Sequence, residues 1–390
     1  MSNLSELDMT AADNNGAPPN GAPEGMLAGK VNDVIRELMS AIAKYYQDQR
    51  GSLTTAGSGN AYTLTTNQTH TALSDQSILC FRVDRANTDN VTLNVDGLGA
   101  KYLYKGSPLH EYESGELKAG QMLVAVYNPT GDHYEVIGPQ NPVPVGYKHG
   151  LICSNGSDAD HDLNITAGSC CDDDGTGVIV LAGALAGKQL DAAWAAGAAA
   201  GMLDAGSIAL DTTYHIFAIR NPTTGAVDAL ASTSASSPTM PSGYTQKRRI
   251  HSVMTDASAN IYAFWRVGDH VWWAAEGSDQ IGGGEQTAAI TRQLETLNKI
   301  PAGVRVRPIV QVELEVDGEW TIYAMGPPDD ATGSNDLTFT VSAAANRTEV
   351  CVTLPFYCNT SAQVYHSLND GTDDLDVYVR GYVDDLDRMQ

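Results

Sequence analysis

Short runs of alternating apolar and polar residues, separated by turns, recur from residue 51 to the end of the chain. Apolar residues at every second position are typical of a strand with one buried face, whereas the apolar face of a helix repeats every 3.6 residues. Asp-Gly, Gly-Asp and Asn-Pro pairs, which favour turns, separate the runs. Glycine contributes 38 of the 390 residues, and only 18% are charged. We therefore expect a mainly β protein, long enough for two or three domains.

Three segments differ in pattern, and we interpret each as a structural region. Residues 1–50 begin with a proline-rich arm and continue as a short helix. Residues 51–140 predict a small β-sandwich or barrel, and residues 145–390 predict a larger, jelly-roll-like β-sandwich. A linker with three prolines separates the two β regions. Within the larger region, residues 185–203 are the one stretch compatible with a helix.

The helix predicted over residues 30–49 carries apolar residues spaced alternately four and three apart, which is a heptad seam. The seam comprises Val31, Ile35, Leu38, Ile42 and Tyr45. Two heptads are too short to be stable alone. The helix therefore either lies on its own domain or packs against copies of itself or a docking partner. Because the preceding arm cannot bury a core, we expect residues 1–50 to be a docking segment.

Residues 264–273 predict a β-hairpin around a Gly268-Asp269 turn of type II′. This turn places Val267 opposite His270 and Trp265 opposite Trp272. One face then carries Trp265, Val267, His270 and Trp272, and the other carries Phe264, Arg266, Val271 and Trp273. Both faces hold aromatic residues, and two interpretations remain open. All of them are core, which is where tryptophan usually lies, or at least one tryptophan is exposed or at a subunit contact. Trp265, Trp272 and Trp273 are therefore the candidate receptor-binding residues.

Asp158, Asp160 and Asp162 alternate like the start of a calcium-binding loop. Leu163 and Ser169 stand where an EF-hand needs glycine and glutamate, so this is not an EF-hand. A looser structural Ca²⁺ site at the three aspartates is the remaining candidate. The sequence has no phosphate-binding loop, zinc-protease or nucleophile-elbow motif, so we expect no other cofactor and no catalytic residue.

The charge of the chain restricts its partners. With 23 basic and 47 acidic residues, the net charge is −24, which argues against nucleic acid or an anionic membrane as the partner. The apolar stretches are too short for insertion into a membrane. Met1 opens onto polar residues, so we expect no secretory signal and reduced cysteines. The basic run Lys247-Arg248-Arg249 indicates either surface charges paired with aspartates or a site for an anionic glycan.

Seven motifs follow one another in the second half of the chain, at residues 154–165, 188–197, 214–219, 225–230, 238–244, 246–256 and 381–384. In this order they resemble a C-terminal module common in bacteriophage tail fibre proteins. The first 50 residues resemble the segment that attaches such proteins to the virion.

The resemblance implies a homotrimeric virion component that is assembled in the host cytoplasm. Residues 1–50 would bind tail or adaptor proteins, and the C-terminal domain would bind a host surface polysaccharide or another receptor. Two alternatives remain open. One is a tailspike that cleaves glycan with two carboxylates, although 47 acidic residues offer no way to single out a pair. The other is a purely structural tail adaptor or head-decoration fibre.

Overall fold

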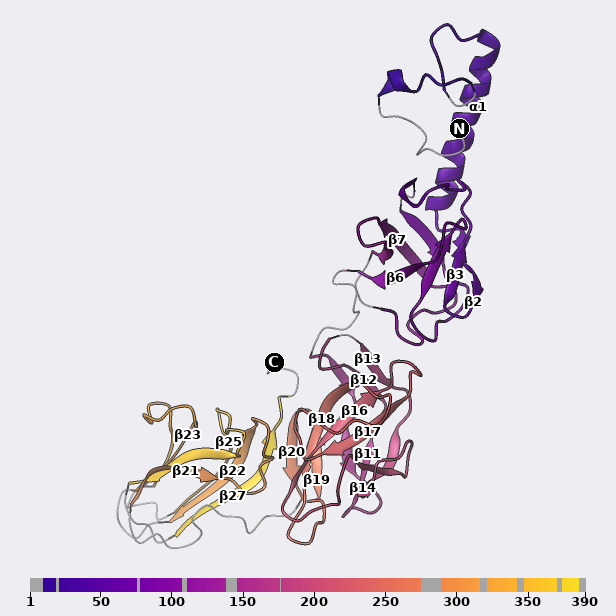
Figure 1. Cartoon of the computed structure of the whole chain (residues 1–390). Helices are drawn as coiled ribbons and strands as arrows, with labels where there is room; N and C mark the ends of the chain where they lie inside the picture. The colour runs from indigo at the N-terminus through magenta and orange to yellow at the C-terminus, as the bar shows by residue number, and fades with distance from the viewer. Residues whose placement is uncertain are drawn as a thin grey trace. The chain divides into compact units, whose positions relative to one another are not determined.

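The computed structural model describes residues 10–18, 21–75, 78–106, 111–137, 146–175, 177–274, 289–315, 321–341, 347–369 and 374–385. The chain divides into two compact units, Met1–Pro142 with Asn221–Ala226, and Val143–Arg220 with Val227–Gln390 (Figure 1). The predicted β class is confirmed, since 44% of the residues that the structure describes are in strands and 8% are helical. No helix in the described ranges has both the length and the apolar composition needed to cross a membrane.

The first unit joins a helix to an eight-stranded sheet. Helix α1 spans Ala28–Gln49, so it begins two residues before the predicted range of 30–49 and ends where predicted. The sheet has the order β1-β4-β7-β8-β6-β5-β3-β2. Its strands are β1 (Leu53–Thr54), β2 (Ala56–Ser58), β3 (Ala61–Leu64), β4 (Leu79–Arg82), β5 (Thr92–Val95), β6 (Lys101–Lys105), β7 (Met122–Asn128) and β8 (His133–Val136). Alternate residues are buried, as in β3 and β5, so one face of these strands encloses a core that includes Tyr62, Phe81 and Leu93.

The N-terminal part of the second unit contains a seven-stranded sheet of order β10-β11-β14-β15-β17-β16-β18 and a three-stranded sheet of order β13-β12-β9. The strands are β9 (Lys148–Gly150), β10 (Cys153–Asn155), β11 (Asp162–Ile165), β12 (Gly168–Cys171), β13 (Val178–Leu181), β14 (Leu185–Ala193), β15 (Gly201–Leu203), β16 (Thr213–Arg220), β17 (Val227–Ser232) and β18 (Gln246–Met254).

The expectation that residues 185–203 are compatible with a helix is wrong, because they form β14 and β15. Gly187, Gly197 and Ala199 have φ values of 66°, 98° and 52°. A right-handed helix requires negative φ at every residue, so these three positions exclude it.

The C-terminal part of the second unit has a five-stranded sheet of order β19-β20-β27-β22-β25 and a four-stranded sheet of order β21-β26-β23-β24. The strands are β19 (Phe264–Val267), β20 (His270–Trp273), β21 (Ile290–Thr296), β22 (Arg307–Glu315), β23 (Thr321–Gly326), β24 (Leu337–Val341), β25 (Arg347–Thr353), β26 (Gln363–Leu368) and β27 (Asp374–Val383). The strands of segment 145–390 thus form four sheets, whereas the sequence analysis expected one sandwich. Alternation identifies buried faces but not which strands pair, so it could not divide the strands among sheets.

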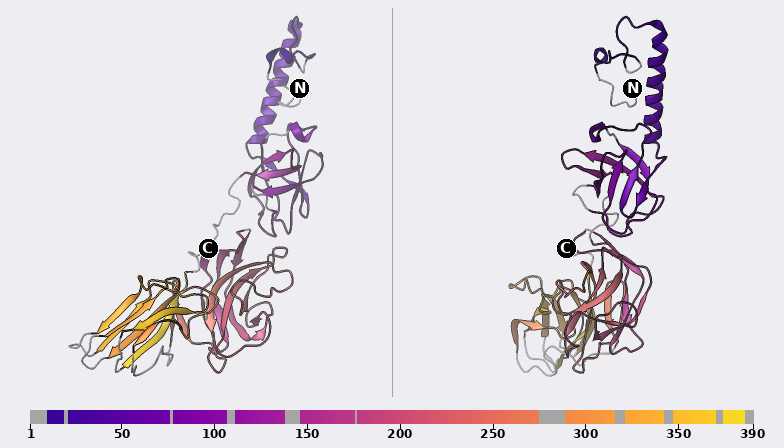
Figure 2. Two further views of the ribbon diagram at one scale, coloured as in Figure 1. Left: turned by 60° about the vertical axis from the view of Figure 1, so that its left-hand side comes forward. Right: turned by 45° about the vertical axis from the view of Figure 1, so that its right-hand side comes forward.

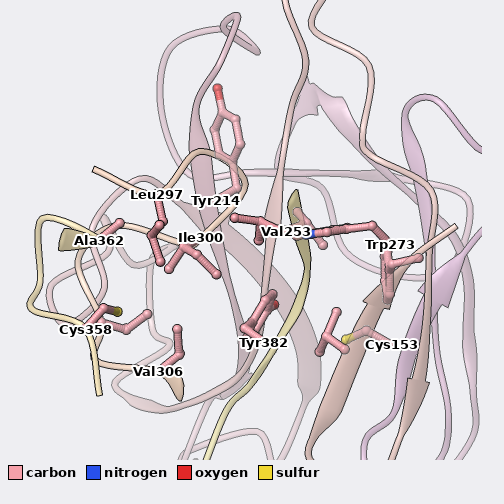
Figure 3. Packing of buried hydrophobic residues seen from close by; sticks show 14 of the residues in the cluster. Cys153, Tyr214, Val253, Trp273, Leu297, Ile300, Val306, Cys358, Ala362 and Tyr382 are labelled. Atoms are coloured by element: carbon pink, nitrogen blue, oxygen red, sulfur yellow. The ribbon is translucent and has the colours of Figure 1, made fainter. Parts of the chain in front are cut away.

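One hydrophobic cluster runs through the second unit. It includes Ile216 of the seven-stranded sheet, Val312 of the five-stranded sheet and Tyr323 of the four-stranded sheet, all fully buried. Figure 3 shows part of it, with Trp273 and Val306 on opposite sides of Tyr382. Shared burial of this kind couples the sheets energetically, because opening one exposes apolar surface of the others to water.

Candidate functional site

The hairpin β19–β20 has the predicted register. Trp265 lies opposite Trp272, and Val267 lies opposite His270. Gly268 has a φ of 61°, the positive value that the first turn position of a type II′ turn needs. The turn therefore determines which four side chains share each face of the hairpin.

The two faces of the hairpin differ sharply in exposure. Trp265 is 53% exposed and Val267 is 68% exposed, whereas Trp272 on the same face is half-buried. On the opposite face, Phe264 and Val271 are buried. We call the outer surface formed by Trp265, Val267, His270 and Trp272 the aromatic platform.

Trp273 belongs to the core and not to the platform. It is 6% exposed, its Nε1 donates a hydrogen bond to the Lys299 carbonyl at 3.2 Å, and its ring packs against those of Tyr262 and Tyr382. Of the three predicted receptor-binding tryptophans, the structure places Trp265 and Trp272 at the surface. The sequence left this choice open, because Phe264 and Trp273 make the second face equally aromatic.

The platform rests on a rigid support. β20 pairs with β27, where Trp272 lies opposite Gly381. A Cβ atom at Gly381 would lie 2.0 Å from the Val271 carbonyl oxygen, so only glycine allows the two strands to approach this closely. At the other edge, the Phe264 amide donates to Asn155 Oδ1 at 3.0 Å. Both strands of the hairpin are therefore held, which favours a preformed binding surface.

Helix α1 presents its predicted seam to solvent. The exposed fractions of Val31, Ile35, Leu38, Ile42 and Tyr45 lie between 36% and 51%, and those of Met39 and Tyr46 exceed 60%. Figures 1 and 2 show the helix extending beyond the strands of the first unit. The interpretation that the seam lies on its own domain is therefore wrong. Large exposed apolar patches are typical of interaction surfaces, and a docking role for this seam stays a prediction.

Asp48 attaches the C-terminal end of α1 to its unit. One carboxylate oxygen accepts hydrogen bonds from the Asn67 amide at 2.8 Å and from Asn67 Nδ2 at 2.7 Å. The other accepts from the Gln68 amide and Gln68 Nε2, both at 3.1 Å. Asp48 is 1% exposed, so these four bonds replace its hydration. No sequence pattern indicates this role, because an aspartate near the end of a helix is ordinarily solvated.

The three aspartates of the predicted calcium site lie around the start of β11. Asp158 accepts a hydrogen bond from the Asp160 amide at 3.2 Å and lies 3.4 Å from His161 Nδ1. Burial raises the pKa of Asp162, and the carboxylates of Asp158 and Asp191 raise it further. In the part of the chain that the structure describes, no three His, Cys, Asp or Glu residues are grouped to hold a metal ion. Calcium binding at Asp158, Asp160 and Asp162 stays a prediction.

The basic run at residues 247–249 is paired with aspartates. Lys247 donates to Asp173 Oδ2 at 2.6 Å, and Arg248 lies 3.7 Å from the same carboxylate. Arg249 forms a two-pronged ion pair with Asp384, with distances of 2.7 and 3.0 Å. These contacts favour a structural role over the alternative of an anionic-glycan site.

Two ion pairs, each with a buried carboxylate, join motifs that are far apart in the sequence. Arg249 and Asp384 belong to the motifs at 246–256 and 381–384. Lys188 and Asp228 belong to those at 188–197 and 225–230, and their charged atoms lie 3.1 Å apart. These residues belong to the motifs that carry the resemblance, but no local pattern predicts their pairing. Opposite charges in separate motifs were the available signal.

A scan against models of known protein families finds no match, and a search of curated proteins finds none that is similar.

Proposed function

We propose that the chain is a bacteriophage tail fibre protein that attaches to the tail through residues 1–50 and binds a host surface glycan through its second unit. The observation that carries the proposal is the aromatic platform, on which Trp265 and Trp272 lie directly opposite each other at the surface. The order of motifs along residues 154–384 supports the same class of protein.

The platform suits a sugar ring for electrostatic as well as apolar reasons. The face of an indole ring carries partial negative charge, which attracts the weakly positive C–H groups on one side of a pyranose. Val267 extends the apolar surface, and His270 adds a ring that can donate or accept a hydrogen bond. With a net charge of −24, the chain favours a neutral glycan over a strongly anionic one.

The exposed seam of α1 supports attachment and self-association at the other end of the chain. Isoleucines occupy two of its positions, and Met39 and Tyr46 widen the apolar face beyond a single stripe. Tail or adaptor proteins, or two further copies of the helix in a homotrimer, would cover it. Trimerisation comes from the resemblance to tail fibres, and a jelly-roll-like arrangement of the second unit comes from its strand pattern. Both are part of the proposal. Assembly would take place in the host cytoplasm.

Adsorption of labelled full-length protein to cells of candidate hosts tests this function. We expect saturable staining of susceptible cells that is lost when their surface polysaccharide is removed. Staining of no cell type would contradict host binding and favour a structural tail adaptor or head-decoration fibre. Incubation of the protein with extracted glycan distinguishes the tailspike alternative, because new reducing ends would identify a depolymerase.

A further inference from the structure

A pocket of about 750 Å³ lies in the second unit, separate from the aromatic platform. One wall comes from the strands β16–β18 and their connections, including Thr213 and Thr255. The facing wall comes from residues 296–303, together with Ser361 and Ala362. Its size falls within the range of small-ligand sites.

Hydrogen bonds hold the two walls in place. The Ala302 amide donates to Thr213 Oγ1 at 3.1 Å, which links one wall to the other. The Leu297 amide donates to the Ala362 carbonyl at 2.9 Å. Thr255 Oγ1 donates to the Ala209 carbonyl at 2.6 Å and accepts from the Thr212 amide at 3.0 Å. The pocket is therefore formed before any ligand arrives, which reduces the entropy lost on binding.

The lining combines an apolar base with neutral polar groups. Leu297, Ile300 and Ala362 are at most 3% exposed and belong to the hydrophobic cluster, where Figure 3 shows them together. Tyr262 adds an aromatic ring to this base. A saccharide has apolar and polar surfaces that match this lining, because its C–H groups form apolar faces and its hydroxyls lie around the ring.

Several polar side chains of the lining are available to a ligand. Asp211, Thr233, Asn298 and Ser361 are exposed, and their side chains make no hydrogen bond with any residue in the described ranges. The lining carries one carboxylate, on Asp211, and one ammonium group, on Lys299, which lies 4.6 Å from the centre of the Tyr262 ring. The two formal charges cancel, which favours an uncharged ligand over an anionic one.

We propose that this pocket is a second carbohydrate site, which binds one or two residues of a neutral saccharide. The inference deepens the proposed function and rests on it for the class of ligand, but it involves different residues from the aromatic platform. Two sites would let one chain hold a polysaccharide at two points, which strengthens attachment without a tighter single contact.

Saturation-transfer NMR on the full-length protein tests the site. The probes are glucose, galactose, mannose, rhamnose and N-acetylglucosamine, each with its disaccharide, and glucuronic acid serves as the anionic comparison. We expect transfer to at least one neutral sugar. Ser361→Trp, which fills the pocket, should remove it, and Asn298→Ala should weaken binding about tenfold by removing a hydrogen-bonding group. Thr340→Trp is the matched control, because Thr340 is exposed on β24 outside the pocket.

The outcomes separate this inference from the proposed function. The pocket is supported as a sugar site if saturation transfer to the sugar survives in the Trp265→Ala, Trp272→Ala double variant but is lost in Ser361→Trp. This result supports the pocket even if the intact protein stains no cells. Three results would overturn the pocket as a sugar site. These are no saturation transfer to any neutral sugar, a preference for glucuronic acid, and full sugar binding by both Ser361→Trp and Asn298→Ala. If the pocket binds no sugar but host binding depends on the aromatic platform, the proposed function is retained and only the second site is excluded.

Discussion

Lys188 and Asp228 form an ion pair 3.1 Å long inside the second unit, with 0% and 3% of their side chains exposed. Lys188 Nζ also donates to the carbonyl oxygens of Ala195, Gly197 and Gly201 at 2.9–3.1 Å. Asp228 accepts hydrogen bonds from the Gly197 and Ala229 amides at 2.7 and 2.6 Å. The pair therefore fixes the connection between β14 and β15 against β17.

Replacement of the buried lysine is expected to destabilise the second unit strongly. Lys188→Met leaves Asp228 buried without its counter-ion, and such a loss costs about 3–5 kcal/mol in the free energy of unfolding. Lys247→Met is the matched control, because its pair with Asp173 is partly exposed and contributes at most about 1 kcal/mol. Chemical denaturation measures both. Equal effects of the two changes would contradict the structural role given to Lys188.

This pair also shows what the sequence could and could not predict. Strand positions follow from alternation, and the hairpin register follows from Gly268-Asp269, because both depend on neighbouring residues. The pairing of Lys188 with Asp228, and of Arg249 with Asp384, depends on which distant strands become neighbours. Asp384 is 2% exposed and paired with Arg249, and no pattern around residue 384 indicates this burial.

The candidate site likewise has features that the local sequence predicts and features that depend on distant residues. The hairpin register was predictable, but exposure of a tryptophan was only one of two open interpretations, because both faces carry aromatic residues. The sequence could not decide that Trp273 is the buried one, because its partners Tyr262 and Tyr382 lie far from one another along the chain. The pocket was missed entirely, since hydroxyl and amide residues from separate segments of the chain carry no pattern that links them.

Acid should weaken the second unit because of buried histidines. Burial, together with the nearby Arg249, lowers the pKa of His215 to about 4, and burial also lowers those of His251 and His366. An unfolded histidine binds its proton near pH 6.5. Below that pH the unfolded state therefore binds more protons, so the free energy of unfolding falls between pH 6.5 and about 4, by about 3 kcal/mol for His215 alone.

Thermal unfolding at pH 7, 6, 5 and 4.5 measures this decline. His215→Asn keeps a partner for Ser252, which lies 2.9 Å from His215 Nδ1, and should show a shallower dependence on pH. A His215→Asn profile parallel to the wild type would show that this group does not titrate as described.

Asp48 is expected to hold α1 on the first unit. Asp48→Ala removes four hydrogen bonds to a buried carboxylate and should lower the free energy of unfolding of this unit by about 3 kcal/mol. Asp33→Ala is the control, because Asp33 is partly exposed and paired with Lys30 on the same helix. This change should alter the free energy of unfolding by less than about 0.5 kcal/mol. Circular dichroism and limited proteolysis near residue 50 compare the two. Equal proteolysis of both variants would argue against the anchor.

The exposed seam predicts self-association. Light scattering at micromolar concentration should give three times the chain mass of 41.3 kDa. Ile35→Asp with Ile42→Asp puts two charges into the seam and should shift the mass toward that of one chain, because a buried unpaired charge opposes assembly. Leu210→Asp, at an exposed leucine of the second unit, is the control and should leave the mass unchanged. A wild-type mass near 41 kDa would exclude the trimer.

Binding of purified host surface polysaccharide to the aromatic platform tests the central claim most directly. Isothermal titration should give saturable binding by the wild type and at least about tenfold weaker binding by the Trp265→Ala, Trp272→Ala double variant, because the stacking surface is removed. Tyr102→Ala, at an aromatic residue of the first unit that is 50% exposed, should bind as the wild type does. Unchanged affinity of a folded double variant would contradict the assignment of the platform as the receptor-binding surface.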